Sequence, residues 1–122
     1  ILKRSNIHPI FLLAPTSTDE RISLIAEHGT GMIYCVSVVG ITGARRALSS
    51  ELPDFIKRVK EKTNTPLAVG FGISEPEHVA SVGNIAEAAV VGSAFVGAIS
   101  SAQENDHESA AEKFISRLVN GG

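Results

Sequence analysis

The chain has 122 residues, of which 43% are hydrophobic and 20% charged, and its formal net charge is −2. This length and composition fit one globular domain with a core of its own and exclude a disordered chain. There is no dense run of Lys or Arg for nucleic acid or an anionic membrane, and no apolar run approaches the roughly 20 residues of a membrane span. We therefore expect a cytoplasmic protein that binds neither nucleic acid nor a membrane.

Short apolar runs rich in branched side chains recur along the chain, as expected for strands buried on both faces. The predicted strands are residues 9–14 (PIFLLA), 32–37 (MIYCVS), 67–72 (LAVGFG) and 88–92 (AAVVG).

Apolar residues at helical intervals follow each predicted strand. Capping-box spacing at residues 17–20 and 74–77 predicts two helix starts, and residues 93–99 predict a short helix. The predicted apolar stripes are Ile22, Ile25 and Ala26; Leu52, Phe55, Ile56 and Val59; Val79 and Val82; and Ala111, Phe114, Ile115 and Leu118.

Alternation of strand and helix predicts right-handed crossovers and a parallel sheet. Two α/β architectures fit four such units: a small doubly wound sheet, or half of a (β/α)8 barrel. In barrels, the loops after the last two strands commonly bind phosphate together with a short extra helix. Residues 93–99 have the position of that helix, which favours the barrel.

Glycines follow the last two predicted strands: Gly70 and Gly72 after one, Gly92 before Ser93 after the other. Glycine lets the backbone turn sharply and present its N–H groups to an anion, and a helix N-terminus adds its dipole. No Lys or Arg occurs in residues 67–97, so a phosphate there would be held by amides and the Ser93 hydroxyl. The alternative is that these glycines only shape turns.

Other reactive side chains give no sign of a site. Cys35, the only cysteine, lies inside an apolar run and is expected to fill the core. The histidines lack metal-ligand spacing within one element, so we expect no metal site. They are His8, His28, His78 and His107.

Three motifs carry a resemblance to a known family: "YCVSVVGITGAR", "GFGIS" followed by Pro76 and Glu77, and "VVGSA". In this order and spacing they resemble the C-terminal half of the tryptophan synthase alpha subunit. The resemblance implies a TIM barrel of which residues 1–122 form a single partial domain. It implies a lyase of tryptophan biosynthesis that cleaves indole-3-glycerol phosphate to indole and glyceraldehyde 3-phosphate without a cofactor. It also implies a beta-subunit partner in an α2β2 assembly.

The resemblance assigns substrate-binding roles by position. Gly70, Gly72 and the Gly92–Ser93 pair would hold phosphate, with Phe71 lining the pocket. Tyr34 corresponds to an active-site tyrosine, although a buried tyrosine can equally serve the core through its hydroxyl. The other assigned residues are Leu12, on the indole pocket, and Thr42 and Gly43, in a mobile loop.

The family's proton-transferring Glu and Asp belong to a part of the barrel that this sequence does not contain. None of the acidic residues here ends a predicted strand, so no catalytic residue is assigned, and we expect the 122-residue chain to be inactive. Two other functions stay open: a phosphate-binding barrel of the isomerase type, or a non-catalytic half-barrel for binding or assembly.

Two further expectations concern flexibility and assembly. Residues 40–50 (GITGARRALSS) fit a lid over the active site, or else an ordinary exposed loop. Four parallel strands would leave two sheet edges and an apolar face uncovered, so we expect self-association of a half-barrel.

Overall fold

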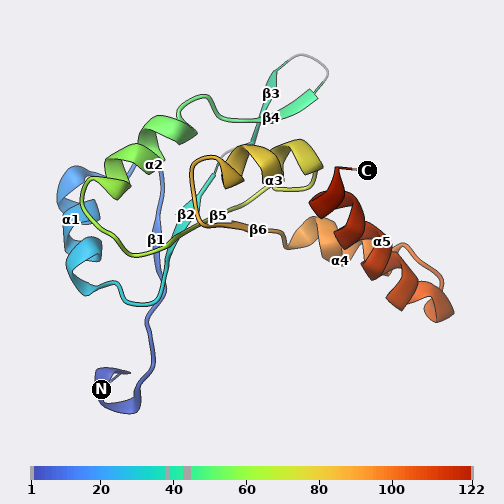
Figure 1. The fold of residues 1–122 in the computed structure, drawn as a ribbon, viewed down its shortest axis with the longest axis horizontal. Coiled ribbons are helices and arrows are strands. Elements are labelled where there is room, and N and C mark those ends of the chain that lie inside the picture. Colours follow the sequence, from blue (N-terminus) through green and yellow to red (C-terminus); the bar gives the residue numbers. More distant parts are fainter. Residues whose placement is uncertain (1, 38, 43–44, 122) are drawn as a thin grey trace.

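A single parallel sheet forms the centre of the protein. The computed structural model describes residues 2–37, 39–42 and 45–121. The sheet has the strand order β1-β2-β5-β6, and all its pairs are parallel (Figure 1). The prediction of four parallel strands alternating with helices is confirmed. The strands are β1 (Phe11–Leu13), β2 (Ile33–Val36), β5 (Leu67–Gly70) and β6 (Ala88–Val90).

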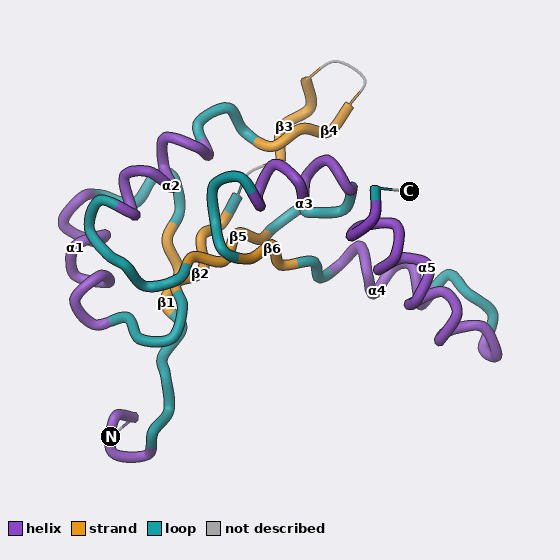
Figure 2. The backbone as a smooth tube through the Cα atoms, in the orientation of Figure 1, coloured by secondary structure: helices purple, strands orange, loops and turns teal. Residues whose placement is uncertain are grey.

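Helices connect and follow these strands. Figure 2 shows α1 and α2 beside one end of the sheet and α4 with α5 beyond the other. The helix α4 packs on α5, where the rings of Phe95 and Phe114 lie 5.8 Å apart. The helices are α1 (Asp19–His28), α2 (Leu52–Lys60), α3 (Pro76–Gly83), α4 (Ser93–Ser100) and α5 (His107–Asn120), with 3-10 turns η1 (Leu2–Ser5) and η2 (Glu104–Asp106).

The helix α2 follows its predicted pattern closely. Its four apolar residues recur on one side, and all are buried, whereas Lys57 on the other side is exposed. Pro53 stands in the first turn, where the missing N–H costs no helical hydrogen bond. The sequence pattern therefore predicts correctly which side of α2 enters the core. The buried residues are Leu52, Phe55, Ile56 and Val59.

Two helices differ in detail from their sequence predictions. The helix α3 has no Ser74–Glu77 capping box, because Glu75 is the N-cap, makes no side-chain cap bond, and precedes Pro76 at the first helical position. On α5, Phe114 and Leu118 are buried, but Ile115 is 47% exposed. The apolar stripe of α5 is wider than the surface it packs against.

Residues 39–48 contain a β-hairpin where the sequence indicated a loop. The strands β3 (Val39–Thr42) and β4 (Arg45–Leu48) pair antiparallel in a separate two-stranded sheet. The alternation of Val39 and Ile41 with smaller residues suits a strand. In Figure 1 the hairpin projects away from the parallel sheet.

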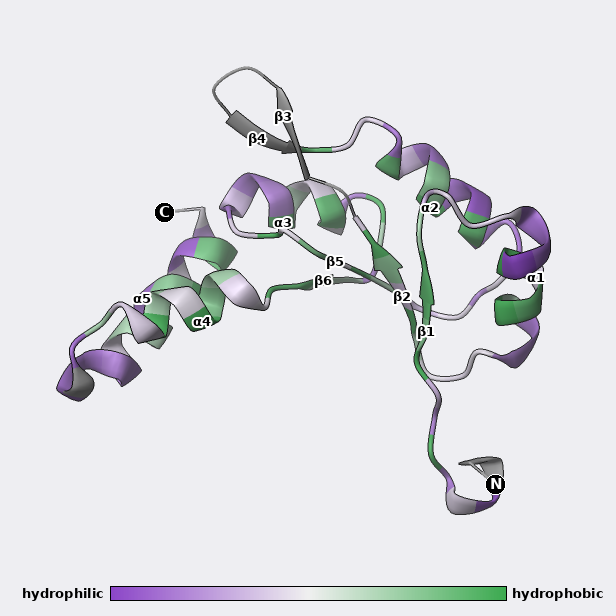
Figure 3. Cartoon of the chain, turned by 180° about the vertical axis from the view of Figure 1, so that it is seen from behind, coloured by the Kyte–Doolittle hydropathy of each residue, from purple (hydrophilic) through white to green (hydrophobic). Residues whose placement is uncertain are grey.

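The two faces of the parallel sheet differ in burial. One face carries Leu13, Cys35 and Val69, which are almost fully buried against apolar residues of α1, α2 and α3. Burial raises the pKa of Cys35 to about 12, with a smaller contribution from the charge of Glu87, so the thiol stays protonated as expected of a core residue. Figure 3 shows that β1 and β2 consist mainly of hydrophobic residues, drawn in green.

The other face, here called the open face, carries one row of residues in register: Leu12, Tyr34, Ala68 and Ala88. Only Ala68 in this row is buried; Leu12 is 55% exposed. An exposed leucine at the edge of a parallel sheet is unusual, because such sheets are normally covered on both faces.

Candidate functional site

The carboxyl ends of three strands meet at one edge of the sheet. Val36 of β2 is in register with Gly70 of β5, and Gly70 is in register with Val90 of β6. Because the strands are parallel, the segments that follow them emerge side by side at this edge. The structure thus brings the turn after β5 close to the turn after β6. We call this the C-terminal edge.

Gly70 gives space to Tyr34. A Cβ atom added to Gly70 would lie 2.0 Å from Oη of Tyr34 and 2.6 Å from its Cζ. Such distances are impossible for real atoms, so only glycine permits the tyrosine ring to cross β5. The sequence interpretation of Gly70 as a turn residue is therefore incomplete: Gly70 is the last residue of a buried strand, and it positions Tyr34 on the open face.

The turn after β5 has a backbone conformation that side chains rarely adopt. Phe71 has a φ of 84° and Gly72 a φ of 82°. For an aromatic residue this conformation costs about 1–3 kcal/mol, and such strain concentrates at functional sites. Phe71 is also 70% exposed, so no burial of its ring compensates for the strain. Some other interaction must hold the turn.

Ser37, directly after β2, supplies that interaction. Its hydroxyl lies 2.8 Å from the carbonyl oxygen of Gly70 and 2.7 Å from that of Phe71, and its amide donates to the Gly70 carbonyl at 2.7 Å. Ser37 is fully buried. The sequence prediction missed this residue, although a serine closing the apolar run MIYCVS was the available signal.

The turn after β6 leads directly into α4. Gly92 is the N-cap, with φ −119° and ψ −89°, and no side chain caps the helix. The amides of Phe95 and Val96 donate to the Gly92 carbonyl, so the helical bonds begin there. Amides ahead of them, including that of the exposed Ser93, have no helical partner and can receive an anion.

The other residues predicted to bind substrate do not belong to the turns after β5 and β6. Leu12 is paired in register with Tyr34 on the open face. Thr42 ends β3, in register with Arg45. Gly43 lies outside the described residues. The structure therefore brings Gly70, Phe71 and Gly72 together with Gly92 and Ser93 at the C-terminal edge, and places Leu12 and Tyr34 on one row of the sheet.

Arg117 of α5 supports the start of α3. Its guanidinium donates to the Glu75 carboxylate at 3.0 Å and to the Ser74 carbonyl at 3.2 Å, and it lies 5.6 Å from the centroid of the Phe114 ring. Both partners come shortly after Gly72. Arg117 thereby links α5 to the segment that continues the turn after β5.

A second polar cluster lies at the opposite edge of the sheet. The Glu87 carboxylate accepts from Lys60 Nζ and from the amide of Leu67, both at 2.8 Å. The hydrogen bond from Lys60 is the main cause that holds the pKa of Glu87 below its usual range, and the Leu67 amide adds to it. Glu87 joins α2, β5 and β6 and takes no part in the C-terminal edge.

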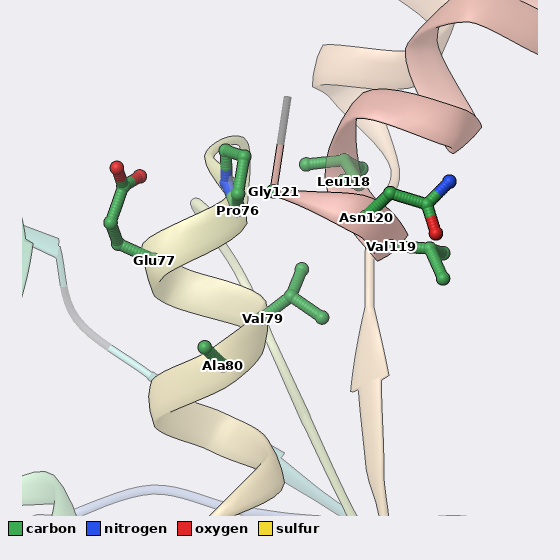
Figure 4. Close-up of a pocket in the computed structure, with 8 residues that line it drawn as sticks. All are labelled: Pro76, Glu77, Val79, Ala80, Leu118, Val119, Asn120 and Gly121. Carbon is green, nitrogen blue, oxygen red and sulfur yellow. The ribbon is translucent and has the colours of Figure 1, made fainter.

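A groove of about 410 Å³ runs between α3 and the end of α5 (Figure 4). Pro76, Val79 and Leu118 are among the residues that line it, and none of the predicted substrate-binding residues does so.

Within residues 2–37, 39–42 and 45–121 there is no cluster of three His, Cys, Asp or Glu side chains able to hold a metal ion. No helix in the same ranges is long and apolar enough to cross a membrane.

Comparison with known proteins decides the family. A family model described as tryptophan synthase alpha chain matches residues 1–120. The tryptophan synthase alpha chain of Solibacter usitatus is 47% identical over 125 residues, which cover 98% of this chain and 45% of that relative. The chain belongs to the tryptophan synthase alpha chain family. The resemblance inferred from the motifs is confirmed.

Solved structures agree with this assignment. The tryptophan synthase α2β2 complex of Pyrococcus furiosus superimposes with a TM-score of 0.85 at 35% identity, over 97% of this chain and 48% of the matched one. A second relative by sequence, the tryptophan synthase alpha chain of Roseiflexus castenholzii, is 47% identical over 92% of this chain and 42% of its own length. The chain therefore spans less than half the length of these tryptophan synthase alpha relatives, and the expected fold class, half of a TIM barrel, is confirmed.

Proposed function

We propose that this chain supplies the phosphate-binding part of a cytoplasmic tryptophan synthase alpha subunit, a lyase that cleaves indole-3-glycerol phosphate to indole and glyceraldehyde 3-phosphate. One observation carries the proposal: the left-handed turn at Phe71 and Gly72 lies at the same sheet edge as the uncapped N-terminus of α4. Together they offer main-chain N–H groups from two turns to one anion.

The open face would receive the indole part of the substrate. Leu12 and Tyr34 lie in register in one row there, and the Tyr34 hydroxyl lies against Gly70, at the edge where phosphate would bind. An aromatic ring beside an exposed leucine offers apolar contact with an indole ring, while the tyrosine hydroxyl remains available for a polar contact. Residues 1–122 would then act as one partial domain.

Proton transfer is assigned to no residue of this chain. Cleavage requires a general acid and a general base within about 3 Å of the reacting atoms. Glu87 is engaged at the opposite edge of the sheet, and Glu75 is paired with Arg117. We therefore expect the 122-residue chain to bind phosphate but to release no indole from indole-3-glycerol phosphate.

A titration tests this proposal. We expect the chain to bind glycerol 3-phosphate, and to bind indole propanol phosphate more tightly because the indole adds apolar contact. Replacing Gly72 with Ala should weaken both affinities about tenfold, which equals about 1.4 kcal/mol, because the left-handed turn then opens. Calorimetric titration measures these affinities.

Gly121→Ala is the matched control. Gly121 also has a left-handed φ, 76°, but it caps α5, and a Cβ there would meet no atom within 4 Å. Both substitutions place alanine at a left-handed φ, and only Gly72→Ala should reduce anion affinity. Equal losses in the two variants, or no binding by the unaltered chain, would refute the proposed phosphate site. An isomerase or an assembly module is not expected to bind indole propanol phosphate more tightly than glycerol 3-phosphate.

We also propose two kinds of partner: a tryptophan synthase beta subunit, as in the Pyrococcus furiosus complex, and, without it, a second copy of this chain. The exposed Leu12 on the open face and the unpaired outer sides of β1 and β6 favour association. Light scattering after size exclusion should give a mass above that of the 12.8 kDa monomer. Leu12→Lys should shift the measured mass toward that of the monomer. A monomeric mass for both the unaltered chain and Leu12→Lys would contradict self-association.

A further inference from the structure

The hydroxyl of Ser37 contacts two backbone carbonyls at the C-terminal edge. Serine has one hydroxyl proton, and here two carbonyl oxygens, those of Gly70 and Phe71, lie within hydrogen-bond distance of it. The Gly70 carbonyl also accepts from the Ser37 amide. The Phe71 carbonyl accepts from the hydroxyl, which links it to the residue directly after β2.

Fixing these carbonyls also fixes two amides. A peptide unit is planar and trans, so its C=O and N–H groups point in opposite directions. The Gly70 carbonyl and the Phe71 N–H belong to one peptide unit, and the Phe71 carbonyl and the Gly72 N–H belong to the next. Since both carbonyls are drawn toward Ser37, both N–H groups are directed away from it. Among the described residues, neither amide donates to a backbone carbonyl of a turn or loop.

We propose that Ser37 is a positioning residue that aims the Phe71 and Gly72 amides at the phosphate group of the ligand. This inference rests on the proposed phosphate site and adds to it the residue that orients its donors. Ser37 does not touch the ligand. It acts by holding Phe71 in its left-handed conformation. Without this hydrogen bond, Phe71 would relax to a less strained conformation.

The test compares three variants of the 122-residue chain. In Ser37→Ala the Kd for glycerol 3-phosphate should rise about tenfold, or about 1.4 kcal/mol. The NMR order parameters of the Phe71 and Gly72 amides should fall from about 0.85 to below about 0.6, because the turn becomes mobile. Ser37→Thr keeps the hydroxyl, so it should keep affinity within about threefold although its extra methyl group, in a fully buried position, lowers stability.

Ser17→Ala is the control. The Ser17 hydroxyl accepts from the Ala14 amide at 3.0 Å in the turn after β1, so this variant removes a comparable hydroxyl bond elsewhere. It should lose stability without losing phosphate affinity. The proposal is overturned if Ser37→Ala keeps both the affinity and the rigid turn, or if affinity follows stability across all three variants. Absence of binding by the unaltered chain would refute the phosphate site, while the order parameters would still report whether Ser37 orders the turn.

Discussion

Replacing Gly70 with Ala is expected to displace Tyr34 and to destabilise the chain by about 1–3 kcal/mol, the usual cost of overpacking a rigid site. The new Cβ would lie 2.0 Å from the tyrosine oxygen and 3.0 Å from Cβ of Val90, so both neighbours must move. Gly70 is a buried residue of β5 between two paired strands, which leaves the backbone little freedom to adjust. The tyrosine ring is the part that can leave.

Intrinsic fluorescence measures this displacement directly. The chain contains one tyrosine and no tryptophan, so its emission reports on Tyr34 alone. In Gly70→Ala, acrylamide should quench that emission more strongly, and the urea midpoint should fall. Gly97→Ala is the control: a Cβ there meets no atom within 4 Å, and alanine inside α4 should stabilise the chain by about 0.4–1 kcal/mol. An unchanged quenching constant in Gly70→Ala would contradict the observed contact.

The second large effect is expected in the core. Phe55→Ala should lower the free energy of unfolding by about 3–5 kcal/mol, because it removes a buried ring and leaves a cavity. Phe55 is 3% exposed and packs among the buried residues of α1, α2 and the covered face of the sheet. Since small domains are stable by only about 5–15 kcal/mol, this loss would remove a large fraction of the chain's stability.

Urea denaturation followed by circular dichroism gives the measurement. Lys57→Ala on the exposed side of the same helix should change the free energy of unfolding by less than about 0.5 kcal/mol. If Phe55→Ala changed it by as little as the control does, the core would be loosely packed, as in a molten state, and the burial seen in the structure would not describe the chain in solution.

The period of the apolar residues made most of the fold predictable. In α2 the stripe from Leu52 to Val59 identifies the buried side, and unbroken apolar runs identify the four parallel strands. Cys35 was correctly expected in the core. The hairpin at residues 39–48 was missed because glycines and arginines there are also typical of a loop, and a two-stranded antiparallel pair depends on partner strands rather than on local composition.

The candidate site was predictable only in outline. The glycines after β5 and β6 marked the right edge of the sheet, since strand ends are visible in the sequence. The individual roles were not visible. Space for Tyr34 at Gly70 and the double contact of the Ser37 hydroxyl both join residues more than 30 positions apart in the sequence, and such pairing follows from register. The start of α3 was misplaced because a serine and a glutamate at the right spacing do not form a capping box when Glu75 lies between them as the N-cap.

The separation of Glu87 from the C-terminal edge has a consequence for how ligand binding would respond to acid. The four residue steps from the Leu67 amide, which Glu87 binds, to the Phe71 amide cover about 13 Å, which exceeds the screening length of about 8–10 Å at physiological ionic strength. Protonating Glu87 would therefore weaken the fold as pH falls through its lowered pKa, yet hardly change the potential at the anion. Backbone amides do not ionise in this pH range, so their donor capacity is unchanged. The affinity for a phosphate monoester would then decline where the ester dianion itself takes up a proton, near a pH of about 6.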